Sequence, residues 1–154
     1  MLIDAAGFRL SPESRPALLR MSAGPLGGLV ARLPRPRPIL ALGLRQVFHD
    51  DTLVTRERLD EYEAPFLRLG AVAALRALLN APAPSAAAFE AMLRELRVPT
   101  LVMWGAEDRW IPVADADRFT AAIPGARKVV LPDCGHMPQE ERPAKVLVLL
   151  REFL

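Results

Sequence analysis

The sequence has few of the residues that build covalent or metal crosslinks. One cysteine and two histidines among 154 residues exclude an internal disulfide and give no metal-binding spacing, so we expect no metal and no cofactor. No apolar run reaches the roughly 18 residues that a membrane-spanning helix needs. The first residues also lack the basic and apolar segments of a secretion signal. We therefore expect a cytoplasmic protein without membrane contact.

The chain also lacks an excess of charge of one sign. Lys and Arg number 20 and Asp and Glu number 18, so the net charge is only +2, and basic residues are scattered among acidic ones. Nucleic-acid binding needs a clustered basic surface, so we expect no such partner. Because the basic residues are almost all arginines and alanine and proline are abundant, the composition indicates a bacterial source.

Apolar residues, in contrast, make up 51% of the chain, and two continuous runs stand out. Residues 98–104 and 127–131 have the length and composition of buried strands, which are typical of parallel sheets covered on both faces. A helix is predicted after each strand, over 112–123 and from Pro143 to the end of the chain. The order strand, helix, strand, helix predicts right-handed parallel units in an α/β fold.

Residues 1–97 have a different character. Leu2 and Ile3 look like the end of a strand, whereas residues 8–97 contain no convincing strand and are predicted to form helices broken by Pro and Gly. Thr55 and Ser85 are predicted N-caps, and Pro34–Pro38 is predicted to be an extended connector. The apolar residues that recur at helical spacing are expected to pack in a core: Leu59, Tyr62, Phe66, Leu69, Val72, Leu75, Leu78, Leu79, Phe89, Met92, Leu93 and Leu96 on these helices, and Val146, Leu147, Leu150 and Phe153 on the last one.

Two side chains with complementary chemistry follow the two predicted strands. Asp108 comes three residues after Gly105, and His136 comes directly after Gly135. Side chains at the carboxyl ends of parallel strands meet in one crevice, where a carboxylate can fix the tautomer of an imidazole and stabilise its charged form. Glu107 and Asp133 are rivals of Asp108 for this role.

A nucleophile to accompany this pair is missing. A serine nucleophile needs a preceding strand and the strained G-x-S-x-G turn, which none of Ser11, Ser14, Ser22 and Ser85 has. Cys134 is two residues from His136 and is interpreted as a small packed residue. His49, beside Asp50, is interpreted as a histidine of the surface or the edge of the core.

The segments together resemble the C-terminal end of an α/β-hydrolase: strand, G-x-x-D, helix, strand, G-H and final helix over Val98–Leu154. Met1–Gly7 resembles the strand that precedes the family's helical lid. The resemblance implies a partial parallel sheet of about three strands with an inserted all-helical lid: residues 1–7 a core strand, 8–97 the lid, and 98–154 the C-terminal part of the core.

The resemblance also implies roles for individual residues. Asp108 matches the family's acid and His136 its base, and Trp110 is expected to form a wall of the substrate pocket. Asp4, after the first strand, is a further candidate acid because some relatives place one there. The family's first strands, oxyanion loop and nucleophile elbow have no counterpart in the 154 residues.

The implied activity is hydrolysis of an ester, amide, epoxide or C–C bond. A small-molecule substrate is expected only if an N-terminal half completes the site. The chain alone is expected to be inactive. The preferred explanation is that the 154 residues are part of the product of a longer gene. The alternative is a non-catalytic remnant or interaction module, which pairs with a separate N-terminal half, or with itself, through an exposed sheet edge.

Overall fold

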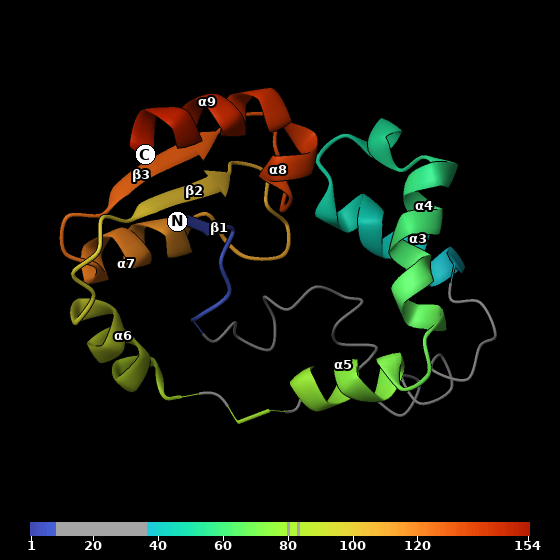
Figure 1. The fold of residues 1–154 in the computed structure, drawn as a ribbon, viewed down its shortest axis with the longest axis horizontal. Coiled ribbons are helices and arrows are strands. Elements are labelled where there is room, and N and C mark those ends of the chain that lie inside the picture. Colours follow the sequence, from blue (N-terminus) through green and yellow to red (C-terminus); the bar gives the residue numbers. More distant parts are fainter. Residues whose placement is uncertain (9–36, 80, 83) are drawn as a thin grey trace.

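The computed structural model describes residues 1–8, 37–79, 81–82 and 84–154. Predictions for Ser11, Ser14, Ser22 and Pro34 lie outside the described residues. The elements in chain order are β1 (Leu2–Ile3), α3 (Arg37–Val47), η1 (Asp51–Leu53), α4 (Arg56–Glu63), η2 (Ala64–Leu67), α5 (Ala71–Leu79), α6 (Ala86–Arg94), β2 (Leu101–Gly105), α7 (Ala114–Ala122), β3 (Arg127–Leu131), α8 (Pro138–Glu141) and α9 (Pro143–Phe153) (Figure 1).

The three strands form one parallel sheet in the order β1-β2-β3. This arrangement confirms the α/β prediction with three parallel strands. Strand β2 begins at Leu101 rather than at Val98, whose side chain is 62% exposed. The predicted strand start was too early because Pro99 has no N–H to donate to a neighbouring strand.

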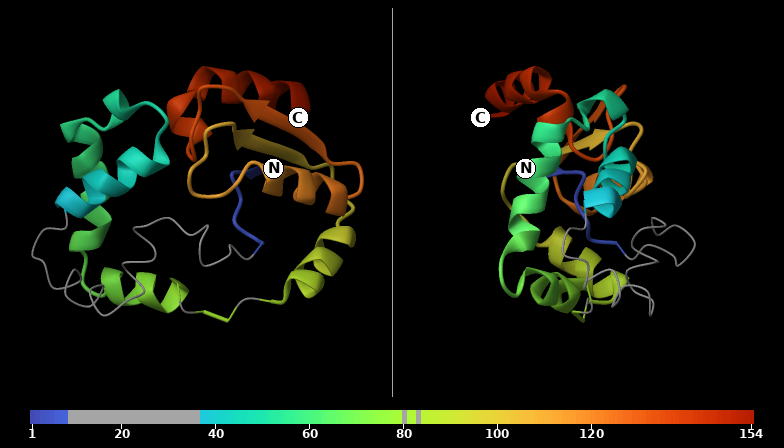
Figure 2. Two further views of the ribbon diagram at one scale, coloured as in Figure 1. Left: turned by 180° about the vertical axis from the view of Figure 1, so that it is seen from behind. Right: turned by 90° about the vertical axis from the view of Figure 1, so that its right-hand side faces the viewer.

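Each face of the sheet is covered by a helix. Successive side chains of a strand point to opposite faces, so Val102 and Trp104 pack with Phe119 of α7, whereas Leu101 and Met103 pack with residues of α9. Helices α7 and α9 accordingly lie on opposite sides of the sheet (Figure 2). All five residues of β2 are buried, as expected for a central strand between two helical layers.

The helices between β1 and β2 form two groups. Helices α3, α4 and α5 extend away from the sheet in an arc over residues 37–79, which we call the helical segment (Figures 1 and 2). Helix α6, in contrast, packs against α7, and its Phe89 makes edge-on aromatic contacts with Phe8 and Phe119 at centroid distances of 5.4 and 6.0 Å. Part of the region between the strands therefore belongs to the core packing.

The predictions of helix ends were right at two N-caps and wrong at the start of α3. The Thr55 hydroxyl accepts a hydrogen bond from the Arg58 amide and the Ser85 hydroxyl accepts one from the Ala88 amide, each at 3.2 Å, which confirms both N-caps. The extended connector predicted as far as Pro38 was wrong at its end, because α3 already begins at Arg37. A proline in the first helical turn loses no intrahelical hydrogen bond.

The predicted apolar stripes were partly wrong. Met92 on α6 is 60% exposed, Leu78 on α5 is 72% exposed and Leu147 on α9 is 53% exposed, although Leu93 and Val146 beside them are buried. Helical spacing identifies one face of a helix but not whether another layer covers that face. Across the described residues, no helix combines the length and apolarity needed to cross a membrane.

Candidate active site

The loop after β2 presents Asp108 in a fixed orientation. Its Oδ1 accepts hydrogen bonds from the backbone amides of Trp110 and Ile111, at 2.7 and 3.0 Å. The Ile111 carbonyl in turn accepts a hydrogen bond from the buried indole of Trp104, at 3.2 Å. The Asp108 side chain is fully buried, so these bonds hold the carboxylate in place and leave its Oδ2 atom for another donor.

The loop after β3 brings His136 to that free oxygen. The ring nitrogen Nδ1 lies 2.8 Å from Asp108 Oδ2, and the His136 side chain is 18% exposed. An ionised carboxylate only accepts hydrogen bonds, so Nδ1 carries the proton, and the lone pair of a neutral ring is then on Nε2. The structure thus brings together the two residues that the sequence singled out, in the geometry of an acid–base pair.

Two glycines allow the loops to approach this closely. A Cβ atom on Gly105 would lie 1.9 Å from the Gly135 carbonyl oxygen and 2.4 Å from that of Cys134. A Cβ atom on Gly135 would lie 2.4 Å from the Val47 carbonyl oxygen. Both distances are far below any van der Waals contact, so both positions require glycine, and the G-x-x-D and G-H motifs have a steric cause.

Glu141 of α8 is a residue that the sequence analysis missed. Its buried carboxylate accepts hydrogen bonds from the Gly135 amide at 2.9 Å and the Met137 amide at 3.3 Å, on either side of His136. The other oxygen accepts a bond from the His49 amide at 2.8 Å. Glu141 therefore connects the His136 loop to the chain that follows α3. The position of Glu141 shortly after His136 could be read from the sequence, but the three backbone amides that donate to it could not.

The rival acids have other contacts. Glu107 Oε2 accepts a hydrogen bond from the Cys134 amide at 2.8 Å, so Glu107 joins the two loops instead of facing His136. Asp133 is exposed and has a left-handed backbone with φ of 52°, and its carbonyl accepts a bond from Arg142. Among these acids, Asp108 is the one whose carboxylate contacts the imidazole.

Cys134 and Ser85 both have structural roles in the described part of the chain. Cys134 is fully buried, and burial together with nearby carboxylates raises the pKa of its thiol to about 12, which disfavours the reactive thiolate. Ser85 caps α6. Neither residue is placed as a nucleophile for His136 in the part of the chain that the structure describes.

Trp110 and Asp4 both lie beside the pair. The half-buried Trp110 indole stacks on the His136 ring with a centroid distance of 5.7 Å and an interplanar angle of 28°. Asp4, at the end of β1, is 4% exposed, and one of its carboxyl oxygens, one of Asp108 and a ring nitrogen of His136 all lie within 4.8 Å of one another. These three side chains are the set closest to a metal-binding arrangement among the described residues.

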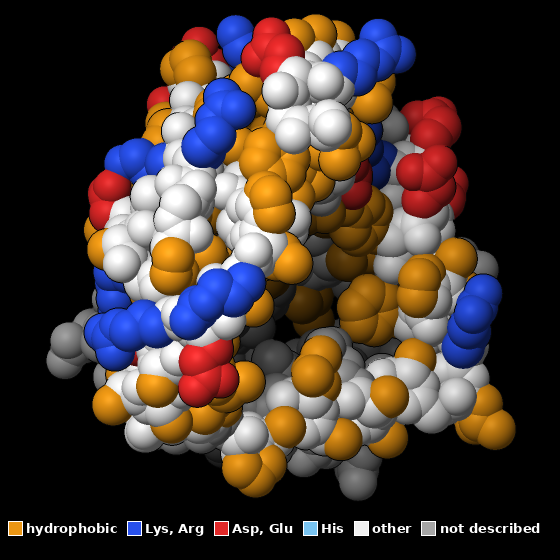
Figure 3. All heavy atoms as spheres, turned by 60° about the vertical axis from the view of Figure 1, so that its left-hand side comes forward, with side chains coloured by type: hydrophobic (Ala, Val, Ile, Leu, Met, Phe, Trp, Pro, Cys, Tyr) orange, Lys and Arg blue, Asp and Glu red, His pale blue; other side chains and the backbone are white. Residues whose placement is uncertain are grey.

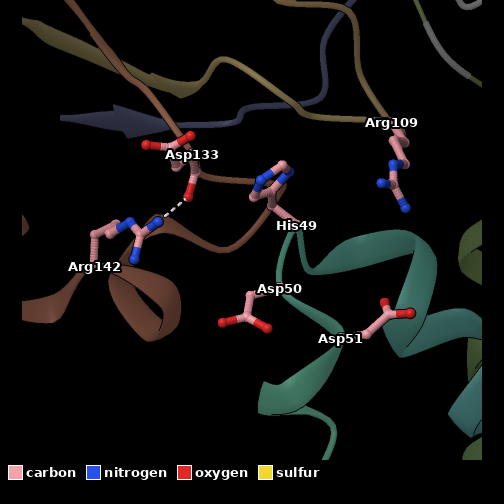
Figure 4. A pocket seen from close by; sticks show the side chains of 6 residues that line it. All are labelled: His49, Asp50, Asp51, Arg109, Asp133 and Arg142. Carbon is pink, nitrogen blue, oxygen red and sulfur yellow. Dashed lines mark hydrogen bonds between the residues drawn. The ribbon is translucent and has the colours of Figure 1, made fainter.

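An open polar pocket of about 560 Å³ lies next to the two loops. It is lined by His49, Asp50, Asp51, Arg109, Asp133 and Arg142 (Figure 4). Asp108 and His136 are not among its lining residues. His49 is half-buried at the edge of this pocket, in keeping with its interpretation as a histidine of the surface or core edge.

A parallel sheet with an aspartate and a histidine on the loops that follow two adjacent strands is the arrangement expected of an α/β-hydrolase fold. The chain belongs to the alpha/beta hydrolase family, whose sequence profile matches residues 1–148.

Particular relatives include epoxide hydrolase A of Mycobacterium tuberculosis, which is 29% identical over 93% of this chain and 41% of its own length. The 2-hydroxy-6-oxononadienedioate/2-hydroxy-6-oxononatrienedioate hydrolase of Klebsiella pneumoniae is 29% identical over 98% of this chain and 58% of its own. The solved structure of 2-hydroxy-6-oxo-6-phenylhexa-2,4-dienoate hydrolase from Rhodococcus sp. has a similar fold, with a TM-score of 0.75 at 21% identity over 99% of this chain and 53% of that one. The chain thus spans about half the length of the relatives it matches.

Proposed function

We propose that Asp108 and His136 are the acid and the base of a hydrolase. The observation that carries this proposal is the 2.8 Å contact between His136 Nδ1 and Asp108 Oδ2 at the carboxyl ends of two adjacent parallel strands. Asp108 orients the ring and stabilises the imidazolium. His136 Nε2 then takes a proton from the attacking hydroxyl or water and later returns it to the leaving group.

The nucleophile of this reaction is proposed to come from residues outside the 154 of this chain. The burial of Cys134 and the capping role of Ser85 support this view for the described residues, and so does the chain's match to about half of each relative. Exposed apolar side chains on α3 and α9, among them Leu42, Leu147 and Val148, would be covered by a further part of the fold. In the space-filling view, hydrophobic side chains also gather around a hollow in one face of the described structure (Figure 3).

The substrate is proposed to be a small molecule with an ester, amide, epoxide or C–C bond to be hydrolysed. Two relatives of this chain are named for an epoxide and for a 2-hydroxy-6-oxo dienedioate, which supports this range. Trp110, stacked on His136, is proposed to form one wall of the substrate site. Helices α3, α4 and α5 are proposed to act as its lid.

The test begins with the coding DNA on the 5′ side of the Met1 codon. An open frame that encodes a strand and a G-x-S-x-G turn would supply the nucleophile, and the joined polypeptide is assayed with p-nitrophenyl esters and styrene oxide. We expect His136→Ala and Asp108→Asn to lower kcat by roughly 10³-fold or more, because each removes a member of the triad. Asp117→Asn, an exposed aspartate on α7, is the matched control and should leave kcat within about twofold of the parent.

The 154-residue chain alone is expected to show no turnover above the His136→Ala variant. Clear ester hydrolysis by the chain alone, abolished by His136→Ala, would overturn the proposal of an external nucleophile. Full activity of the joined polypeptide after Asp108→Asn would overturn the role of the pair.

A second candidate function is association through the sheet edge. Among the described residues β1 pairs only with β2, so its other edge is open to another strand. Light scattering after size exclusion distinguishes the outcomes: a defined dimer that dissociates on dilution supports self-pairing, and a monomer at all concentrations excludes it.

A further inference from the structure

Asp4 has a left-handed backbone conformation, which is uncommon for residues other than glycine. It follows β1 directly, has a positive φ of 40° and is 4% exposed. Non-glycine residues at positive φ are strained, and such residues persist only where surrounding contacts fix them. Here the Asp4 amide donates to the Met103 carbonyl at 3.0 Å, and its Oδ1 accepts a bond from the Gly105 amide at 2.9 Å.

The second oxygen of the Asp4 carboxyl is buried without a partner among the described residues. An ionised carboxylate with a buried, unpaired oxygen is unfavourable, because burial removes water and nothing replaces it. A protonated carboxyl avoids this penalty if that oxygen carries a hydrogen that can be donated.

An acceptor for such a hydrogen lies close by. Oxygen atoms of Asp4 and Asp108 and a ring nitrogen of His136 fall within 4.8 Å of one another. Two carboxylates at this separation in a buried site disfavour each other's ionisation, so that one proton stays between them. Asp108 already accepts hydrogen bonds from two backbone amides and faces the imidazole, so it is the carboxyl placed to accept the hydrogen.

We propose that Asp4 is a positioning residue of the Asp108–His136 pair, which keeps its own carboxyl protonated and donates that hydrogen to the ionised Asp108. The inference deepens the proposed function, and its meaning for catalysis rests on the roles proposed there. The proton shared by the two carboxyls can be tested without any substrate.

The electrostatic surroundings agree with this arrangement. Burial is the largest cause that raises the pKa of Asp4, to about 7, and the charge of Asp108 raises it further, against the lowering effects of the Gly105 amide and of His136. Burial and the charges of Glu141 and Asp4 raise the pKa of the Cys134 thiol to about 12, so this thiol stays neutral in the same range. The Asp4 carboxyl is thus protonated below about pH 7, and at higher pH the site gains a second negative charge.

The test is a carbon-13 NMR titration of the aspartate carboxyl groups in the 154-residue chain, from about pH 4 to about pH 9, which spans the ordinary and the raised values. The Asp4 resonance is identified by its absence in Asp4→Asn. We expect it to titrate near pH 7 and the Asp108 resonance to move over the same pH range, because a shared proton makes the two groups titrate together. In Asp108→Asn the Asp4 midpoint should fall by about half a pH unit or more, since the like charge is gone.

Asp115→Asn is the matched control, because Asp115 is a buried aspartate paired with Arg118 on α7 and should leave the Asp4 midpoint unchanged. An ordinary carboxyl midpoint for Asp4, or a midpoint that Asp108→Asn does not move, would overturn the inference. If Asp108→Asn does not fold, the wild-type Asp108 resonance decides: no movement near pH 7 counts against a shared proton. The assay needs no substrate, so inactivity of the joined polypeptide would refute the proposed function and leave this result standing.

Discussion

The loops at the carboxyl end of the sheet and the helical segment of residues 37–79 keep their structure by different means. In the loops, buried carboxylates of Asp108 and Glu141 accept several backbone amides, and two glycine backbones are in direct contact. In the helical segment, large apolar side chains such as Leu67, Leu69 and Leu78 are more than half exposed. Contacts within this chain therefore position Asp108 and His136, whereas the helical segment leaves apolar surface that these residues do not cover.

The two regions are nevertheless joined by hydrogen bonds. The His136 amide donates to the Val47 carbonyl at 2.8 Å, and the His49 amide donates to Glu141 at 2.8 Å. The end of α3 thus contacts the His136 loop through its backbone.

The largest expected effect comes from adding a methyl group where the two loops meet. Gly105→Ala places a Cβ atom 1.9 Å from the Gly135 carbonyl oxygen, and a backbone atom cannot move aside as a flexible side chain can. We expect it to lower the free energy of unfolding by about 3–5 kcal/mol, or to prevent folding. Urea unfolding followed by circular dichroism measures the loss.

Gly70→Ala in the helical segment is the matched control. Its Cβ atom would meet nothing within 4 Å, and the backbone has φ of +82°, so the cost is that of a strained backbone, about 1 kcal/mol. Equal losses for the two variants would contradict the close loop packing.

Glu141→Gln is expected to have the next largest effect. Gln keeps one acceptor oxygen but loses the charge, and its amino group would face a backbone donor, so one or two of the three amides lose their partner. The expected cost is about 2–3 kcal/mol, with faster hydrogen exchange at His136 and His49. Glu90→Gln, which removes an exposed pair with Arg94, should cost no more than about 0.5 kcal/mol. Unchanged exchange at His49 would show that Glu141 does not join the two regions.

Glu141 also shows where sequence reasoning ends. Asp108 and His136 were predictable because each follows an apolar strand and a glycine, and parallel strands bring such residues to one edge. The partners of Glu141 are amides from two segments far apart in the chain, and an amide carries no sequence signature. Gly105 and Gly135 could be identified in the sequence as parts of the two motifs. The contact between them could not, because it depends on how closely two loops approach each other.

The helices show a second limit. Thr55 and Ser85 were predicted as caps because the hydrogen bond they make spans three residues. Met92 and Leu147 were wrongly predicted as buried because the period of a helix shows which side chains share a face, whereas burial depends on what packs against that face.

Asp4→Asn is expected to change how stability depends on pH. The pKa of Asp4 is about 7 in the folded chain and about 3.9 in the unfolded one, so between these values the folded state binds more protons. The free energy of unfolding therefore falls as pH rises from about 4 to about 7, and the neutral Asn lacks this loss. We expect Asp4→Asn to gain about 1–3 kcal/mol relative to wild type between these two pH values, measured by urea unfolding. A constant difference between the two proteins across this range would mean that Asp4 is ionised throughout.

The smallest expected effect is that of Leu69→Ser in the helical segment. Leu69 is fully exposed, so replacing it removes no buried surface, and the free energy of unfolding should change by no more than about 0.5 kcal/mol. Leu131→Ala, 2% exposed under α9, should cost about 2–5 kcal/mol in the same urea assay. A loss above about 1 kcal/mol for Leu69→Ser would mean that this side chain is covered in solution. If that loss disappeared on dilution, a second copy of the chain would be what covers Leu69. The apolar side chains of the helical segment would then be exposed in the monomer but buried in the dimer.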